Sequence, residues 1–170
     1  RRERGDASGS SPDVSSAPTG RGRVLRLTGQ RADAGFCGAW VHLFDMRSRR
    51  PVYFDASPWN CLTFWIRGAK GGESIRFKAA DARWHRKEDA RPIGHCDEFL
   101  SDGITTSWQH VVIPREKLAG LNLSELASVS FELTEQGEHT VFIDDLCFKQ
   151  SPELLPVDPV AASSDFTASL

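Results

Sequence analysis

Acidic side chains are the first residues of this sequence to test for catalysis, because a sugar-cleaving enzyme needs two carboxyl groups facing one bond. Two adjacent pairs occur, Asp97 with Glu98 and Asp144 with Asp145. Neighbours on a β-strand point to opposite faces, so neither pair can converge on one substrate. The chain also lacks a Gly-x-Ser-x-Gly elbow, a phosphate-binding glycine loop and a His-Glu-x-x-His motif. These observations predict that the protein is not an enzyme.

Four cysteines offer sulfur chemistry: Cys37, Cys61, Cys96 and Cys147. None of them has the Cys-x-x-Cys spacing of common zinc sites, so we do not expect them to bind zinc. An even number of cysteines permits disulfides in an exported protein. Buried free thiols fit the sequence equally well, so both states stay open.

These residues belong to a chain of 170 residues with a net charge of −2. Nucleic-acid binders are usually strongly basic, so we do not expect a nucleic-acid partner. No apolar run reaches the roughly 18 residues of a membrane span. Residues 1–20 and 151–170 are rich in Ser, Pro and small or charged residues, which predicts flexible tails that tether the domain to further domains. The chain starts with Arg, so we expect a fragment or a processed product, with its folded domain at residues 21–150.

Hydrophobic residues between the tails recur with a period near two, which indicates β-strands. Eight strand-like segments are separated by short turns that contain Gly, Pro or Asp. They lie at residues 24–28, 36–44, 61–67, 74–79, 93–100, 108–113, 129–133 and 140–148. Single helical turns are predicted at 115–118 and 124–127. This order predicts an all-β fold, an antiparallel β-sandwich (jelly roll) of two sheets with about eight strands.

Alternation within the strands separates core residues from surface residues. Leu62, Phe64 and Ile66 share the apolar side of their strand, whereas Trp65 and Arg67 share the other side. The same alternation places three further charged residues opposite the core, namely Arg76, Lys78 and Glu132. If these strands belong to one sheet, the side chains form one polar platform that can hold a flat ring.

The last strand-like segment, 141–148, contains an acidic residue in an apolar setting. Asp144 shares its parity with Phe142, Leu146 and Phe148. A carboxylate on the apolar side of a strand is costly unless a partner satisfies it. Hydrogen bonds from loop N–H groups would satisfy it, and so would a hard cation such as Ca²⁺.

Four strings occur in a characteristic order: FDASPWNCLTFWIRGAKGGE (54–73), GITTSWQHVVIP (103–114), LAGLNLSELASVSFEL (118–133) and VFIDDLCF (141–148). Together they resemble β-jelly-roll carbohydrate-binding modules of the galactose-binding-like type, most of all family 11. The resemblance covers about residues 25–148. The same pattern is similar to domains attached to large bacterial extracellular and envelope proteins.

The resemblance implies a non-catalytic module that binds a polysaccharide, β-glucan-like or another glycan, through rings stacked on sugars and polar groups bonded to hydroxyls. The residues that fit these roles are Trp65, Arg67, Arg76, Lys78, Trp84, His110 and Glu132. It also implies a structural Ca²⁺ whose ligands would be Asp144 or Asp145, with Asp33 from the N-terminal side. Trp59 and Trp108 occupy motif positions that we expect in the core. A secreted, cell-surface or periplasmic location follows from the same resemblance.

A second hypothesis uses the same fold without a glycan. In it the sandwich is a structural or protein-interaction domain whose platform is covered by a partner or a neighbouring domain. An exposed apolar patch buried in a dimer would favour this reading.

Overall fold

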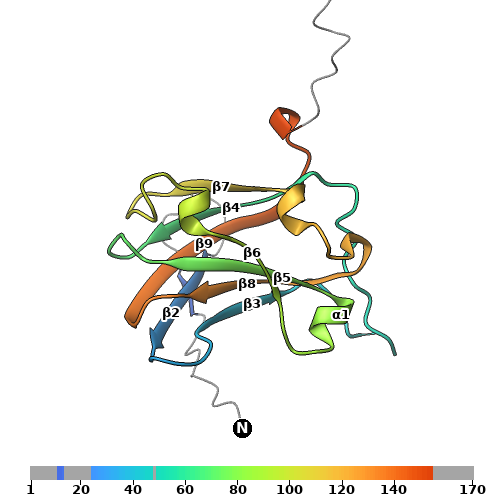
Figure 1. Ribbon diagram of the computed structural model, residues 1–170, viewed down its shortest axis with the longest axis horizontal. Helices are drawn as coiled ribbons and strands as arrows, with labels where there is room; N and C mark the ends of the chain where they lie inside the picture. The colour runs from blue at the N-terminus through green and yellow to red at the C-terminus, as the bar shows by residue number, and fades with distance from the viewer. Residues whose placement is uncertain (1–10, 14–23, 48, 155–170) are drawn as a thin grey trace, which may run out of the picture.

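The computed structural model describes residues 11–13, 24–47 and 49–154. Most of the two predicted tails, residues 1–10, 14–20 and 155–170, lie outside the described residues. The predicted two-sheet antiparallel β-sandwich is confirmed, and Figure 1 shows its two layers. None of the described helices is long and apolar enough to cross a membrane.

A five-stranded sheet forms one layer, in the spatial order β1-β2-β9-β4-β7. Its strands are β1 (Ser11–Asp13), β2 (Val24–Arg31), β4 (Cys61–Gly68), β7 (Gln109–Pro114) and β9 (Gly137–Lys149). A four-stranded sheet forms the other layer, in the order β3-β8-β5-β6. Its strands are β3 (Gly38–His42), β5 (Ile75–Asp81), β6 (Arg91–His95) and β8 (Leu126–Leu133). Every strand pair is antiparallel.

Three phenylalanine rings from three strands join the two sheets. Phe64 on β4 lies 5.1 Å from Phe77 on β5 and 5.2 Å from Phe131 on β8, measured between ring centroids. All three side chains are fully buried, and the pairs meet edge to face. Such aromatic pairs contribute about 0.5–1.5 kcal/mol each beyond their burial. The alternation that predicted these residues as core is therefore confirmed.

Short helices connect the strands. They are α1 (Ala82–His85) and the 3₁₀ turns η1 (Cys96–Glu98), η2 (Arg115–Leu118), η3 (Leu123–Glu125) and η4 (Pro152–Leu154). The turn predicted at 115–118 is confirmed, and the one predicted at 124–127 lies one residue earlier and ends sooner, where β8 begins.

Two segments differ from the sequence expectation. Ser11–Asp13, predicted as flexible tail, pairs with Val24, Leu25 and Arg26 as an edge strand. An edge strand such as β2 offers unpaired backbone groups, so a polar segment without core residues can still join it. The strand predicted at 93–100 instead ends at His95, because the His95 side chain accepts the Asp97 N–H and caps a 3₁₀ turn.

Candidate functional site

The predicted site residues lie on two opposite outer faces of the sandwich. Trp65 and Arg67 belong to β4, in the five-stranded sheet, whereas Arg76 and Lys78 belong to β5, in the four-stranded sheet. The single platform expected from these strands is therefore wrong. Alternation shows which side chains face the core, but it does not show which strands pair.

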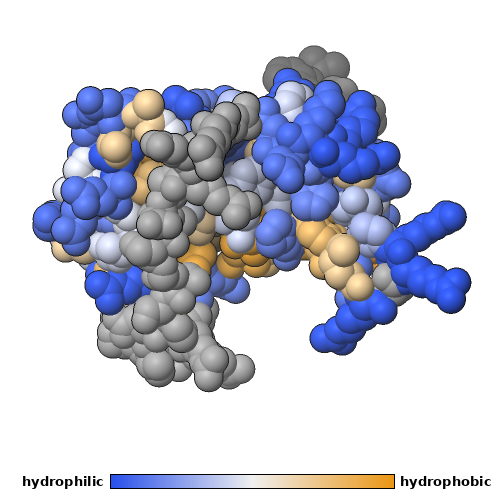
Figure 2. Space-filling view, turned by 90° about the horizontal axis from the view of Figure 1, so that it is seen from below, coloured by the Kyte–Doolittle hydropathy of each residue, from blue (hydrophilic) through white to orange (hydrophobic). Residues whose placement is uncertain are grey.

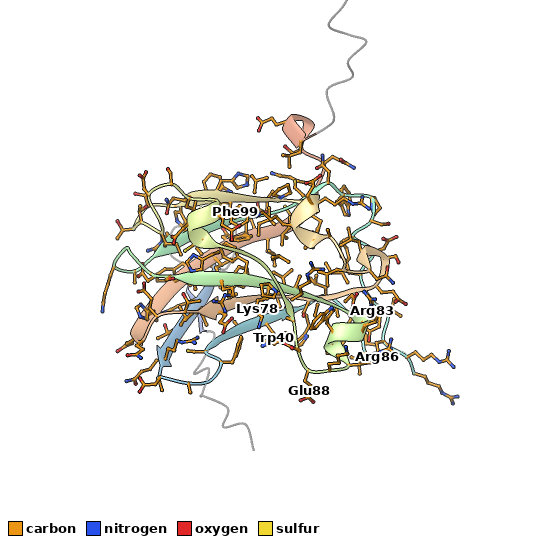
Figure 3. All side chains as sticks on the ribbon, in the orientation of Figure 1. Trp40, Lys78, Arg83, Arg86, Glu88 and Phe99 are labelled. Carbon is orange, nitrogen blue, oxygen red and sulfur yellow. The ribbon has the colours of Figure 1, made fainter. Side chains whose placement is uncertain are left out.

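The first surface is the outer face of the four-stranded sheet, which we call the β8 face. Strand registers place its residues in three rows across β3, β8 and β5. The rows are Gly38, Glu132 and Arg76; Trp40, Ser130 and Lys78; and His42, Ser128 and Ala80. Figure 3 labels Trp40 and Lys78, which flank Ser130 from the two strands on either side of β8. The polar residues of β8 thus lie between Trp40 on β3 and the two cations, Arg76 and Lys78, on β5.

The floor of the β8 face consists of polar atoms without partners. Ser128 Oγ, Ser130 Oγ and Glu132 Oε2 are buried and accept or donate no hydrogen bond among the described residues. Among the described residues, only two other buried side-chain atoms lack a hydrogen-bond partner, Glu73 Oε2 and Asp144 Oδ2. A buried polar group without a partner costs about 1–3 kcal/mol, so a concentration of them on one strand calls for a ligand or water.

Three cations surround the single carboxylate of this face. Arg31 Nη1 lies 3.6 Å from Glu132 Oε1, and Arg76 Nη1 and Lys78 Nζ lie 3.7 and 3.8 Å from Oε2. These separations are too long for hydrogen bonds, so Glu132 leaves N–H groups of Arg76 and Lys78 available. Arg31 Nη1 instead donates to the Leu133 carbonyl at 2.6 Å. With three positive groups around one negative group, the face carries local positive charge.

Aromatic rings gather beside the Ser128 end of the face. His42, Phe44, Tyr53 and His85 lie with ring centroids 4.7 to 6.4 Å apart. At the Glu132 end, a pocket of about 300 Å³ adjoins β6. Its lining includes Arg76, Pro92, Gly94 and His95. In the view from below, Figure 2 shows mostly hydrophilic residues where the atoms are coloured, with hydrophobic residues near the middle and smaller hydrophobic patches elsewhere.

Asp81 fixes the helix that carries His85. Its carboxylate accepts the backbone N–H groups of Arg83 and Trp84 at 2.9 and 3.1 Å and that of Asn122 at 2.8 Å. The Arg83 side chain, labelled in Figure 3, belongs to α1 and donates to the same carboxylate at 2.8 Å. Burial opposes ionisation, but these hydrogen bonds outweigh it and hold the pKa of Asp81 below its usual value.

The second surface is the outer face of the five-stranded sheet, which we call the β4 face. Trp65 lies opposite His110 of β7, with ring centroids 4.9 Å apart. The Arg67 guanidinium lies 3.9 Å from the centroid of Phe142 and 5.2 Å from that of Trp108. Partial desolvation, with the charge of Lys149 second, lowers the pKa of His110. The aromatic and cationic groups of this face are therefore already paired with one another.

The remaining tryptophans differ from their predicted roles. Trp84, predicted as a sugar-binding residue, packs against the hydrophobic core, with Lys87 Nζ 5.3 Å from its ring centroid. Trp59, expected in the core, is 37% exposed. The sequence reasoning missed Trp40, although a signal was present. In the segment 36–44, the even-numbered residues, which include Trp40, are aromatic or Gly, whereas the odd-numbered residues are aliphatic or Cys.

The parity argument that placed Asp144 on the apolar side is wrong. A β-bulge at Asp145, which has φ of 53°, shifts the register between β4 and β9. Asp144 therefore lies opposite Trp65 on the β4 face, whereas Leu146 and Phe148 pack against the core. A bulge inserts one residue and reverses the alternation beyond it, which no count along the sequence reveals.

The three acidic residues expected to hold Ca²⁺ do not form one site. Asp144 Oδ2 is buried without a hydrogen-bond partner, which a cation could satisfy. Asp33, however, follows the end of β2 that pairs with Gly137, seven residues from Asp144 along β9. At about 3.3 Å per residue this separation exceeds any coordination sphere. Ca²⁺ binding stays a prediction of the resemblance, and these residues do not fit it as a set.

All four cysteines are free thiols in the structure. Cys37, Cys61 and Cys96 are buried, and Cys147 is partly buried. Burial raises the pKa of the Cys37 and Cys61 thiols and raises that of Cys96 to about 11. Of the two states that the sequence left open, the structure has the free thiols.

A two-sheet antiparallel sandwich serves many functions, so the class of this domain rests on its sequence family. A sequence profile described as carbohydrate binding domain 30 matches residues 12–150. The chain belongs to this family. The resemblance to β-jelly-roll carbohydrate-binding modules is thereby confirmed, and the family is number 30.

Solved structures show the same fold. The family 30 carbohydrate-binding module of the cellulosomal cellulase Cel9D-Cel44B of Clostridium thermocellum is 22% identical, with a TM-score of 0.63, covering 84% of this chain and 82% of that module. A family 11 module from Clostridium thermocellum, solved in complex with a β-1,3-1,4-mixed-linked tetrasaccharide, is 16% identical, with a TM-score of 0.57, covering 83% and 82%. At these identities the likeness supports the fold alone.

A curated sequence match is partial. The 2-C-methyl-D-erythritol 2,4-cyclodiphosphate synthase of Xanthomonas campestris pv. campestris is 32% identical over 80 residues, which are 39% of this chain and 49% of the synthase. The chain thus spans about half the length of the curated relatives it matches.

Proposed function

We propose that the chain binds a polysaccharide on the β8 face, with Trp40 stacking on a sugar ring and the β8 side chains bonding its hydroxyls. The observation that carries this proposal is the row of buried polar atoms without partners on Ser128, Ser130 and Glu132. Sugar hydroxyls both donate and accept hydrogen bonds, so they suit two serine hydroxyls and a carboxylate in one row.

The surroundings of this row supply the other parts of a sugar site. A tryptophan ring is flat and rigid, and it offers a large contact area at low entropic cost. Trp40 pairs in register with Ser130, so its ring borders the polar row. Across the strand, Arg76 and Lys78 hold N–H groups that Glu132 does not bind at hydrogen-bond distance. The adjoining pocket at β6 extends the surface beyond one sugar.

The β4 face is the weaker candidate, because it holds one buried polar atom without a hydrogen-bond partner, on Asp144, against three on the β8 face. Its rings and its guanidinium contact one another, so a sugar would have to displace the Arg67 contacts or the His110 contact with Trp65. The predicted sugar-binding roles of Trp65, Arg67 and His110 are therefore not part of this proposal. Arg76, Lys78 and Glu132 are kept.

The domain is further proposed to act within a secreted or cell-surface protein, tethered to other domains. The similar family 30 module belongs to a cellulosomal cellulase, which supports this setting. In this role the domain holds an attached protein on its polysaccharide and carries out no bond cleavage itself.

Affinity electrophoresis tests the proposal. Native gels would contain β-glucan, mannan, xylan or an acidic polysaccharide. We expect retardation on at least one gel, with mobility restored by Trp40→Ala. The absence of retardation on every glycan, with the folded state verified by circular dichroism, would contradict the proposal and favour the protein-interaction alternative.

A further inference from the structure

A cluster of three metal-binding side chains lies outside the proposed sugar row. His95, Cys96 and Asp97 follow one another where β6 passes into η1. Their ligand atoms all lie within 4.8 Å of one another, and no other His, Cys, Asp or Glu group of the described residues gathers in this way. The three residues offer a nitrogen, a sulfur and an oxygen donor.

The distances between the donor atoms fit one face of a tetrahedral metal. His95 Nδ1 lies 3.6 Å from Cys96 Sγ, Sγ lies 3.4 Å from Asp97 Oδ1, and Nδ1 lies 3.2 Å from Asp97 Oδ2. Zinc bond lengths of about 2.0–2.3 Å at tetrahedral angles require donor separations of roughly 3.3–3.6 Å. The sulfur and the nitrogen approach different oxygens of Asp97, so the carboxylate must turn to present one oxygen to an ion held by all three residues, whose ligand atoms lie within 4.8 Å of one another.

Hydrogen bonds outside the triad hold two of the donors in place. His95 Nε2 lies 2.9 Å from Ser74 Oγ, which in turn bonds Thr134 Oγ1. A donor bond from Nε2–H to Ser74 leaves the Nδ1 lone pair free, the tautomer that a metal on Nδ1 requires. The Ile75 N–H points at Cys96 Sγ at 3.5 Å and partly offsets the burial that raises the pKa of this thiol. Second-shell bonds of this kind are typical of metal-ligating side chains.

We propose that His95, Cys96 and Asp97 bind a divalent transition metal of the zinc class, with a fourth position open to solvent. A thiolate and a carboxylate together neutralise the two charges of such an ion. Asp97 is 72% exposed in its side chain, and His95 lines the pocket at β6, so an ion can reach the site. Binding exchanges the Cys96 S–H bond for a metal–sulfur bond and releases that proton to solvent.

The same residues also cap η1. The Asp97 N–H donates to His95 Nδ1, but at 3.5 Å this bond is weak, so a metal can replace it at small cost. The second capping bond, from the His95 N–H to Glu98 Oε1 at 2.9 Å, involves none of the three donors and is kept on metal binding. The sequence expectation of no zinc rested on the absence of paired cysteines, whereas the proposed triad uses one cysteine with a histidine and an aspartate.

Cobalt(II) titration of the untagged, reduced full chain tests the proposal. Co²⁺ replaces Zn²⁺ in such sites and shows a thiolate-to-cobalt absorption band. We expect that band at one Co²⁺ per chain, with loss of the band on adding Zn²⁺. Cys96→Ser abolishes the band, whereas Cys147→Ser, which removes a more exposed thiol, leaves it unchanged. A band that persists in Cys96→Ser, or no band with Co²⁺ in excess, overturns the proposal.

Two further variants separate metal binding from folding. Asp97→Asn changes an exposed side chain, so the fold is kept, and Zn²⁺ affinity measured by calorimetry falls at least tenfold. Ser74→Ala removes the second-shell bond to His95 and lowers the affinity by about 10–100-fold. Unchanged Zn²⁺ affinity in Asp97→Asn would also overturn the proposal. Sugar binding on the β8 face plays no part in this test, so either conclusion can fail alone.

Discussion

The two outer faces of this sandwich contain similar kinds of residues, but the contacts of these residues differ between the faces. On the β4 face, Trp65 stacks on His110, and Arg67 lies between two rings. On the β8 face, Trp40 borders a row of buried polar atoms that have no hydrogen-bond partner. The comparison teaches that a tryptophan beside an arginine does not by itself identify a binding face. Rings and cations contact one another on both faces. What distinguishes the faces is the number of buried polar atoms without a hydrogen-bond partner, which is three in the β8 row and one, on Asp144, on the β4 face.

Magnitudes support this division. Each cation–π contact of Arg67 contributes about 0.5–2 kcal/mol, so the β4 face stabilises the fold. Each buried polar atom without a partner on the β8 face costs about 1–3 kcal/mol. A domain that carries such a cost on one strand recovers it when a ligand supplies the missing hydrogen bonds.

The largest expected effect concerns the helix beside the β8 face. Asp81→Ala removes the cap of α1 and leaves the Asn122 N–H unpaired, so the free energy of unfolding falls by roughly 2–4 kcal/mol. Urea unfolding measures this change. Asp102→Ala, in an exposed turn, is the control and should change stability by less than about 0.5 kcal/mol. Equal losses in both variants would remove Asp81 as the anchor of this side.

The same carboxylate gives a pH dependence. Its folded pKa lies below the unfolded value, so its stabilisation is present above the unfolded pKa of about 3.9 and is lost as the pH falls through the folded pKa. Between pH 7 and pH 2, the wild type should lose more stability than Asp81→Asn. Parallel pH profiles of the two proteins would contradict this assignment.

Serine substitutions on the β8 face should change stability and binding in opposite directions. Ser128→Ala with Ser130→Ala removes two buried hydroxyls without partners, so stability rises by about 1 kcal/mol or more. Loss of their bonds to sugar weakens binding by about 0.5–1.5 kcal/mol per bond, or roughly two- to tenfold. Thermal melts and calorimetry measure the two effects.

The matched control lies on the β4 face. Thr63 is equally buried, but its Oγ1 bonds Cys147 Sγ at 3.3 Å. Thr63→Val should therefore leave stability unchanged or lower, and glycan binding unchanged. A serine double variant that loses stability would show that its hydroxyls have partners, and the contrast between the faces would fall.

Arg67→Lys should affect folding and leave binding intact. Lysine lacks the planar guanidinium that stacks between Phe142 and Trp108, so stability falls by about 0.5–1.5 kcal/mol. Arg76→Lys on the β8 face, whose side chain is 47% exposed, should change stability by less than about 0.5 kcal/mol. A larger loss of stability in Arg76→Lys than in Arg67→Lys would contradict the assignment of the β4 face to stability and of the β8 face to binding.

The smallest effect is the titration of His110. Its lowered pKa means that the folded protein favours the neutral ring, so this contribution is present above the unfolded pKa of about 6.5 and declines as the pH falls. His110→Gln should lose less stability than the wild type between pH 8 and pH 5. If glycan binding also depends on His110, the β4 face takes part in recognition.

The sequence was sufficient for the layers and the core but not for the site. Alternation identified Phe64, Phe77 and Phe131 because a residue's side of a strand depends only on local geometry. Strand pairing depends on contacts between distant segments, so the placement of Trp65 and Lys78 on different sheets was beyond a count along the chain.

Two local features reversed specific expectations. The bulge at Asp145 places Asp144 on the outer face, and Asp81 caps a helix in a segment for which no helix was predicted. The helix capped by Asp81 could have been predicted from the sequence, because an Asp before a short run of helix formers is a common signal for the start of a helix. Trp40 was also legible from its strand's alternation, whereas the missing partners of Ser128 and Ser130 appear only when neighbouring strands are in place.

The most direct test compares Trp40→Ala with Trp65→Ala by calorimetry on the polysaccharide that retards the wild type. Trp40 borders the unpartnered row, so its loss should weaken binding at least tenfold, the range of a central aromatic contact. Trp65→Ala should bind within about twofold of the wild type, with a lower melting temperature. Normal binding by Trp40→Ala together with lost binding by folded Trp65→Ala would contradict the account and assign the glycan to the β4 face.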